Sequence, residues 1–147
     1  MSALMIEAIE KAWGWTGIKP VEVIGENEFG NLLIRDSEGK IWRLSPEDVY
    51  CDVVANNDAE YKDLIEDPEF MEDWTMENLV SFAREKLGSL SDTRKYCLKI
   101  PGILGGEYGG DNLGTAPLEE IIAFSGDIAK QIRDLPDGTQ IKIEISD

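Results

Sequence analysis

The side chains of this sequence that could do acid–base or metal chemistry are almost all carboxylates. The chain has 147 residues, of which 30 are Asp or Glu and none is His. Without histidine, Ser-His-Asp and Cys-His nucleophile systems and H-E-x-x-H zinc sites are excluded. Glycoside hydrolysis or metal-assisted phosphoryl transfer by carboxylates stays open, but no pair of acids and no EF-hand spacing stands out. We therefore expect no enzyme, no cofactor and no metal.

A glycine-rich stretch, residues 101–111, is the second place where chemistry could occur. It contains Gly105-Gly106-Glu107-Tyr108-Gly109-Gly110, which lacks the Lys-Ser/Thr ending of a P-loop and does not fit G-x-G-x-x-G. Glu107 and Asp111 would also repel a phosphate. The pattern is typical of a tight turn with an exposed connection. The functional alternative is a loop that contacts a partner, with Tyr108 as an amphipathic anchor.

Carboxylates are densest between residues 47 and 77, where twelve acidic residues and one basic residue, Lys62, carry −11 of the chain's net charge of −16. One interpretation is a solvated helical face that keeps the protein soluble. The other is a binding surface, because a cationic partner would be steered to it and would relieve a repulsion of about 0.2–0.5 kcal/mol per i,i+4 pair. The residues that we predict to contact a partner are Asp58, Glu60, Asp63, Glu66, Asp67, Glu69, Glu72, Asp73, Glu77, Glu107, Tyr108 and Asp111.

The overall charge also limits the class of partner. A net charge of −16 opposes direct binding to nucleic acid or anionic lipid and favours a basic protein. The first residues show no basic leader or cleavage site, and no segment approaches the roughly 20 apolar residues of a membrane span. We expect a cytoplasmic monomer or small homo-oligomer in which Cys51 and Cys97 are free thiols.

Hydrophobic periodicity predicts an α+β fold in a single domain, residues 1–147. We expect a mostly antiparallel sheet of about five to six strands packed against three to five helices. The first helix should begin at a Ser2 cap and end at Gly14. A meander of four strands should follow, at residues 21–24, 31–35, 40–44 and 49–54.

The middle of the chain should be helical. Asn57 and Glu60 resemble a capping box, and Asp67-Pro68 is a second start signal. A third helix should begin near Thr75. The apolar residues that it should turn inward are Leu79, Phe82, Ala83 and Leu87.

The C-terminal part should contain both strands and a helix. A strand is expected at residues 95–100, and a long amphipathic helix should begin beside Pro117. The inward face of that helix should consist of Leu118, Ile121, Ile122, Ser125, Ile128, Ala129 and Ile132. A last strand should carry the alternating residues Ile141, Ile143 and Ile145.

Several short motifs resemble one protein family. They are Glu85-Lys86-Leu87-Gly88-Ser89-Leu90, Tyr96, Ile100-Pro101-Gly102-Ile103-Leu104-Gly105-Gly106, Asp111-Asn112-Leu113 and the helix from Leu118. Their order is similar to that in the C-terminal domain of immunity proteins that guard against type VI secretion DNase effectors, and the resemblance is densest between residues 85 and 124. Two upstream motifs resemble strands of that family and of related SUKH-type immunity domains, namely Phe29-Gly30-Asn31-Leu32-Leu33 and Trp42-Arg43-Leu44.

The resemblance implies a SUKH-like fold and a stoichiometric complex that neutralises a cognate toxin. The implied toxin is a nuclease, whose basic groove for DNA phosphates an acidic surface could occupy. Two alternatives stay open on the residues alone. One is a regulatory or scaffolding module of the same fold, and the other is a small enzyme that uses carboxylates.

Overall fold

The computed structural model describes residues 3–133, which form an α+β fold. The α-helices in this range are α1 (Ala3–Trp13), α2 (Asp58–Glu66), α3 (Pro68–Thr75), α4 (Glu77–Leu87) and α5 (Leu118–Ile132). The strands are β1 (Pro20–Glu26), β2 (Leu32–Asp36), β3 (Ile41–Ser45), β4 (Tyr50–Ala55), β5 (Arg94–Leu98) and β6 (Leu113–Pro117).

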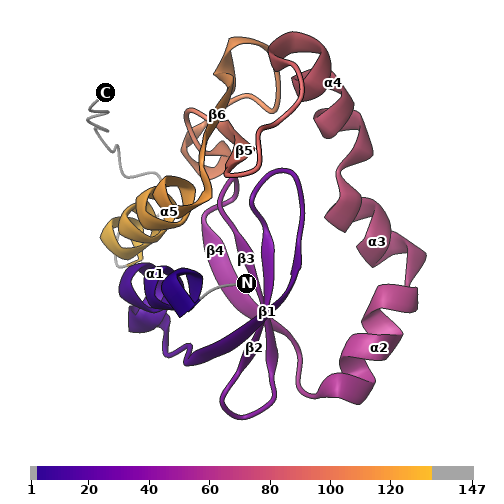
Figure 1. Cartoon of the computed structure of the whole chain (residues 1–147), viewed down its shortest axis with the longest axis vertical. Coiled ribbons are helices and arrows are strands. Elements are labelled where there is room, and N and C mark those ends of the chain that lie inside the picture. Colours follow the sequence, from indigo (N-terminus) through magenta and orange to yellow (C-terminus); the bar gives the residue numbers. More distant parts are fainter. Residues whose placement is uncertain (1–2, 134–147) are drawn as a thin grey trace.

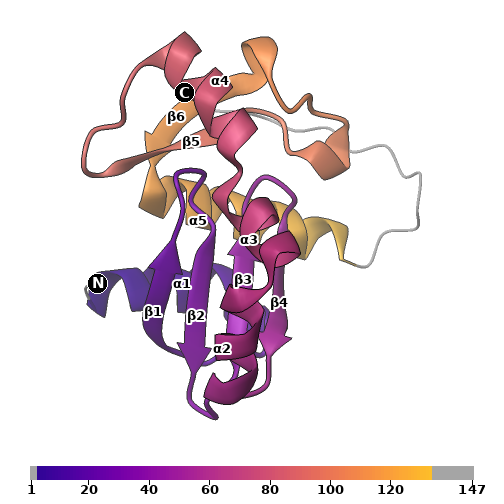
Figure 2. The same cartoon turned by 90° about the vertical axis from the view of Figure 1, so that its right-hand side faces the viewer.

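Helices cover both faces of an antiparallel four-stranded sheet (Figure 1). Its strands lie in the order β1-β2-β3-β4, so each pairs with its neighbour in sequence. The helices α1 and α5 lie side by side on one face, and α2 and α3 run along the other face, as Figure 1 and Figure 2 show from two directions. The β5–β6 hairpin and α4 lie beyond one end of the sheet.

The main core lies between the sheet and the layer formed by α1 and α5. Apolar residues recur at helical spacing along α5, and seven of its residues are buried against α1 and the sheet. Gly126 lets the two helices approach closely, because a Cβ at this position would overlap the carbonyl oxygen of Ala12. Burial of each large apolar side chain here contributes about 1.5–3 kcal/mol, so this layer carries much of the stability.

The opposite layer buries fewer side chains. In the described structure, α2 has no buried residue and α3 has one, Trp74. The rings of Trp74 and Phe70 stack with their centroids 6.4 Å apart and pack with Leu33 and Ile41 of the sheet. A thin apolar contact therefore joins α3 to the sheet.

A buried asparagine adds a polar link between the sheet and α3. Asn27 follows β1, and its Nδ2 donates to the carbonyl oxygen of Trp74 at 2.8 Å. Its Oδ1 accepts from the backbone N–H groups of Phe29 and Asn31, at 3.0 and 2.9 Å. One side chain thus fixes the β1–β2 turn and the end of α3 together.

A smaller core holds the β5–β6 hairpin against α4. Tyr96 of β5 is fully buried beside Phe29, with the ring centroids 5.7 Å apart, and Ala83 of α4 packs in the same cluster. The Tyr96 hydroxyl donates to the carbonyl oxygen of Gly88 at 2.6 Å. The loop after α4 is therefore tied to the hairpin.

Most elements agree with the sequence-based expectation. The first helix, the four-stranded meander, the helix starts at Asn57 and Asp67 and the inward face of α5 are confirmed. Cys51 and Cys97 are free thiols, as expected. The expected cap Ser2 and the last strand lie outside the described residues.

The segment between Thr75 and α5 differs from the sequence-based expectation in three respects. Thr75 ends α3 and does not start a helix; the next helix, α4, begins at Glu77. Phe82 and Leu87 are exposed, because α4 packs on the hairpin through Val80 and Ala83. The strand β6 was not predicted, since its Gly and Pro are typical of loops, and the strands are divided between a four-stranded and a two-stranded sheet.

Candidate partner-binding site

The predicted acids between residues 58 and 77 lie on α2, on α3, at Asp67 between these two helices, and on the first residue of α4. Asn57 caps α2, accepting at Oδ1 from the backbone N–H of Glu60 at 2.9 Å. Asp67 caps α3 in the same way, accepting from the N–H of Glu69 at 3.0 Å. Met76 separates α3 from α4 with a left-handed φ of 50°, which turns the chain between the two helices. Side-chain caps therefore start α2 and α3, the two short helices that present most of the acids.

All nine predicted carboxylates between residues 58 and 77 are exposed, but they do two different things. Asp58 pairs with Arg35 at 2.9 Å, which joins α2 to β2. Asp73 pairs with Arg43 at 2.6 Å, which joins α3 to β3. Glu60 and Asp67 serve the helix caps. These four acids help to hold the helices on the sheet.

The other five carboxylates make no ion pair or side-chain hydrogen bond with any residue in the range 3–133. They are Asp63, Glu66, Glu69, Glu72 and Glu77. We call them the free carboxylates. Because no cation of the described chain neutralises them, their field is directed to solvent and to whatever approaches.

A buried polar network lies beneath α3. The Arg43 side chain is 5% exposed; its Nη1 donates to Asp73, while Nε and Nη2 donate to Asn31 Oδ1 at 3.1 and 3.0 Å. Asn31 Nδ2 donates to Glu47 at 2.7 Å, and the Ser45 hydroxyl donates to the other oxygen of Glu47 at 2.9 Å. Burial raises the pKa of the Glu47 carboxyl. The network explains why this arginine and this glutamate are tolerated in the interior.

The turn that carries Glu47 is strained. Val49 adopts a left-handed φ of 57°, which is unfavourable for a β-branched residue. The turn buries Glu47 and leaves its neighbour Asp48 half-exposed at the surface. Strain of this kind is found where a backbone must place particular side chains.

An open cleft of about 730 Å³ lies between this turn, α3, α4 and the glycine-rich loop. Its acidic lining consists of Glu47, Asp48, Glu72, Asp73 and Glu77. Its apolar lining includes Met71, Met76, Leu79 and Phe82, and Tyr108 also lines it. Among the described residues, Arg43 is the only cation in the lining, and its guanidinium is already paired. The fold thus joins the two predicted contact regions, the acidic helices and Tyr108, in one concave surface.

Tyr108 is held in a fixed position although its side chain is 51% exposed. Its hydroxyl donates to the Asp48 carboxylate. Its ring lies against Gly102, where any Cβ would overlap it. Partial burial and the hydrogen bond to Asp48 both raise the pKa of the Tyr108 hydroxyl, which therefore stays protonated. Tyr108 is therefore both exposed and preorganised.

Asn112 organises the rest of the glycine-rich loop. Its Oδ1 accepts from the Ile100 N–H at 2.8 Å, and its Nδ2 donates to the carbonyl oxygens of Ile100 and Glu107, at 2.9 and 2.7 Å. Gly106 is required, because a Cβ there would overlap the Ile100 carbonyl oxygen. The loop is consequently a set of fixed turns.

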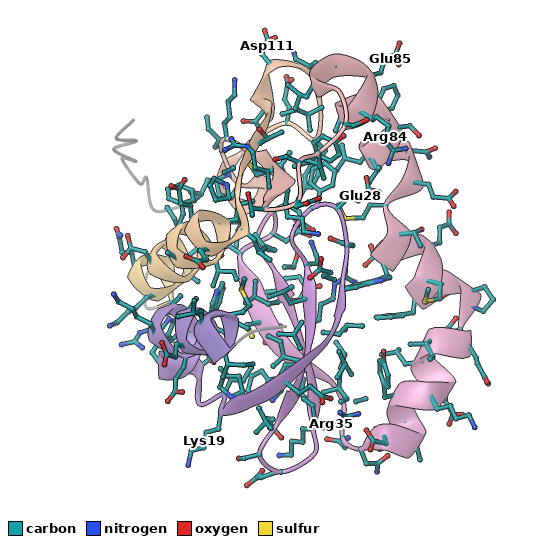
Figure 3. The ribbon with its side chains drawn as sticks, viewed as in Figure 1. Lys19, Glu28, Arg35, Arg84, Glu85 and Asp111 are labelled. Atoms are coloured by element: carbon teal, nitrogen blue, oxygen red, sulfur yellow. The ribbon has the colours of Figure 1, made fainter. Side chains whose placement is uncertain are left out.

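The remaining two predicted residues, Glu107 and Asp111, are exposed but do not line the cleft. Asp111 accepts from Lys86 at 2.8 Å, and this hydrogen bond lowers the pKa of its carboxyl. Figure 3 shows Asp111 near Glu85 at the α4 end of the molecule. Below them, Arg84 pairs with Glu28 at 2.9 Å and ties α4 to the β1–β2 turn (Figure 3).

Phe82 and Asp48 are prominent among the cleft residues that sequence reasoning missed. Phe82 was expected in the core, whereas its side chain is 63% exposed in the cleft. Asp48 lies in the acidic stretch, but nothing in the local pattern indicates that Tyr108, 60 residues later, donates a hydrogen bond to it. Only the tertiary fold brings these three side chains together.

Two further observations concern metal binding and membrane insertion. Residues 3–133 contain no group of three or more acidic or cysteine side chains suited to a metal ion. No helix in the same range has the length and apolar character that crossing a bilayer requires.

Residues 55–129 match the model of a protein family described as T6SS immunity protein Tdi1, C-terminal, where T6SS is the type VI secretion system. The match covers just over half of the chain. This chain belongs to that family. The matched region starts at the end of β4 and includes α2, α3, α4, the hairpin and most of α5. It therefore contains the acidic helices and Tyr108, and the resemblance seen in the sequence is confirmed. No curated protein matches the chain.

Proposed function

We propose that this chain binds and neutralises a cognate type VI secretion toxin through the free carboxylates and the cleft beside them. The observation that carries the proposal is the set of five exposed carboxylates that have no ion-pair partner among residues 3–133, placed in the region that belongs to an immunity family. The stability of the fold requires the paired acids, such as Asp73. It does not require the five free carboxylates.

The toxin that fits this surface is a basic protein, and a nuclease is the best candidate. A nuclease must present cations to DNA phosphates, and a row of carboxylates can occupy the same cations. Such attraction raises association rates by about 10–1000-fold at low salt and weakens as salt increases. The immunity protein would then act without catalysis, cofactor or nucleic acid.

In this proposal the chain works in the cytoplasm, where a DNA-cleaving toxin would meet its substrate. It acts as one domain, as a monomer or small homo-oligomer, and forms a stoichiometric complex. Its protection therefore depends on its concentration relative to the toxin and on the affinity of the complex.

Charge reversal tests the proposal. The variant changes Asp63, Glu66, Glu69 and Glu72 to Lys, and leaves Asp73 intact because Arg43 depends on it. We expect binding to the cognate toxin to fall by at least about 100-fold at low salt, measured by calorimetry, and cells producing that toxin to lose protection.

A matched control carries the same charge change on the opposite layer. It replaces Glu7 and Glu10 of α1 and Glu119 and Glu120 of α5, all exposed, with Lys. This control should keep most of the affinity. If the first variant folds and protects as well as the wild type, the acidic surface serves solubility alone and the proposal is wrong.

A further inference from the structure

The cleft has an exposed apolar side that the free carboxylates do not explain. Phe82 is 63% exposed and Tyr108 is 51% exposed, and both line the cleft. Met76 and Leu79, half-buried, extend the apolar lining between them and the sheet. Large aromatic side chains left this exposed on a soluble protein are typical of contact sites.

Charge complementarity indicates what this apolar surface would contact. Asp48, Glu72 and Glu77 line the same cleft, and no cation of the described chain other than Arg43 does. Arg43 is buried and bonded to Asp73 and Asn31, so it leaves the negative field of the cleft open to a further cation. A partner group that suits the cleft must therefore be cationic and also pack on aromatic rings.

A guanidinium group meets both conditions better than an ammonium group. It is planar, stacks on aromatic faces and donates in a fork that matches carboxylates, whereas a lysine ammonium is compact and strongly hydrated. The molecule already uses this combination internally. The Arg43 guanidinium carbon lies 5.3 Å from the Trp74 ring centroid and 5.8 Å from that of Phe70, while its Nη1 binds Asp73.

We infer that the cleft between α3, α4 and Tyr108 binds an arginine side chain that projects from a loop of the toxin. The guanidinium packs against Phe82 and Tyr108 and donates to the carboxylates of Asp48 and Glu77. The inference rests on the proposed function, which it makes more specific. The free carboxylates of α2 and α3 attract the toxin, and the cleft anchors it.

Preorganisation makes such an anchor effective. Gly102 and Asp48 hold Tyr108 before any partner arrives, and Asn27 and Arg43 hold the end of α3. A partner arginine would therefore order few side chains of this protein when it enters.

The first test replaces Phe82 with Ala and measures affinity for the cognate toxin. Because Phe82 is exposed, we expect the variant to fold with unchanged thermal stability and to lose about tenfold in affinity. The matched control is Leu4→Ala, a substitution at a 66% exposed apolar residue on α1, which should not change affinity. If the Phe82 variant binds as the wild type does while the charge-reversed variant does not, the proposed function stands and the arginine anchor is wrong.

The second test identifies the chemical group. Three five-residue peptides, Gly-Ser-X-Ser-Gly with X as arginine, lysine or the neutral isostere citrulline, are titrated into the ¹⁵N-labelled protein and followed by NMR. We expect the arginine peptide to shift the signals of Leu79, Phe82 and Tyr108, the lysine peptide to shift them less, and the citrulline peptide to leave them unchanged. Equal shifts from arginine and lysine, or shifts centred on α2, would overturn the inference.

Discussion

The two helical layers on the sheet differ in how they are attached. The α1/α5 layer is joined by a continuous apolar core, with seven buried residues from α5 alone. In the described residues, the α2/α3 layer has one buried residue, Trp74, and depends on polar links at Asn27, Asp58 and Asp73. The difference shows that the α1/α5 layer stabilises the fold, whereas the α2/α3 layer presents carboxylates and is attached to the sheet by a few contacts.

The largest effect should come from disturbing the apolar layer. Gly126→Val places side-chain atoms where the Ala12 carbonyl lies, so α1 and α5 must move apart. We expect a loss of about 3 kcal/mol in the free energy of unfolding, measured with urea. The control Ala123→Val, at an exposed position of the same helix, should cost about 0.5 kcal/mol through helix propensity. Equal losses would mean that close packing of the two helices is unimportant.

A smaller effect should follow from cutting one polar link. Asp73→Ala leaves the buried Arg43 guanidinium without its carboxylate and should cost about 2 kcal/mol. The neighbouring change Glu72→Ala removes a free carboxylate and should stay within about 0.5 kcal/mol. Hydrogen exchange should quicken in α3 of the first variant only. Similar costs for the two would contradict the division between paired and free acids.

Removal of a cap should act more locally still. Asn57→Ala deletes the acceptor for the Glu60 N–H and should cost about 1 kcal/mol. Faster amide exchange should be confined to α2, and the α1/α5 layer should be unchanged. Simultaneous loss of protection in both layers would show that they unfold as one unit.

The smallest effect concerns the buried Glu47 and depends on pH. Burial raises the pKa of its carboxyl above the ordinary value of 4.5, so the folded protein holds this proton more tightly than the unfolded chain does. Stability from this group therefore falls as the pH rises from about 4.5 through the folded pKa.

Glu47→Gln should remove that fall. Its amide oxygen can still accept from Asn31, and the Ser45 hydroxyl can accept as well as donate. We expect the variant to be at least as stable as the wild type at pH 7 and to lose this advantage toward pH 4, in urea unfolding at both pH values. Parallel pH profiles would contradict the raised pKa.

The parts of the fold that could be predicted from the sequence are those with a strong local pattern. The inward face of α5 and the meander follow from strong periodicity, and the caps at Asn57 and Asp67 are local signals. Phe82 was misplaced because its helix packs on β5 and β6, and β6 carries no strand pattern of its own.

The candidate site could be predicted only in part, because its residues come from segments that are far apart in the sequence. The acidic residues and Tyr108 were visible as types in the sequence, but their meeting in one cleft depends on contacts between distant residues. The role of Asp73 as an internal partner was hidden too, because Arg43 lies 30 residues earlier. Sequence alone could not separate the paired acids from the free ones.

The separation between paired and free carboxylates has an evolutionary consequence. The side chains of Asp63, Glu66 and Glu69 are exposed and make no ion pair or hydrogen bond within residues 3–133, so substitutions there can change what the surface recognises at little cost to folding. Under the proposed function, a lineage can follow a diversifying toxin one surface residue at a time. The paired acids, which hold the helices on the sheet, meanwhile keep the shape of the binding surface unchanged.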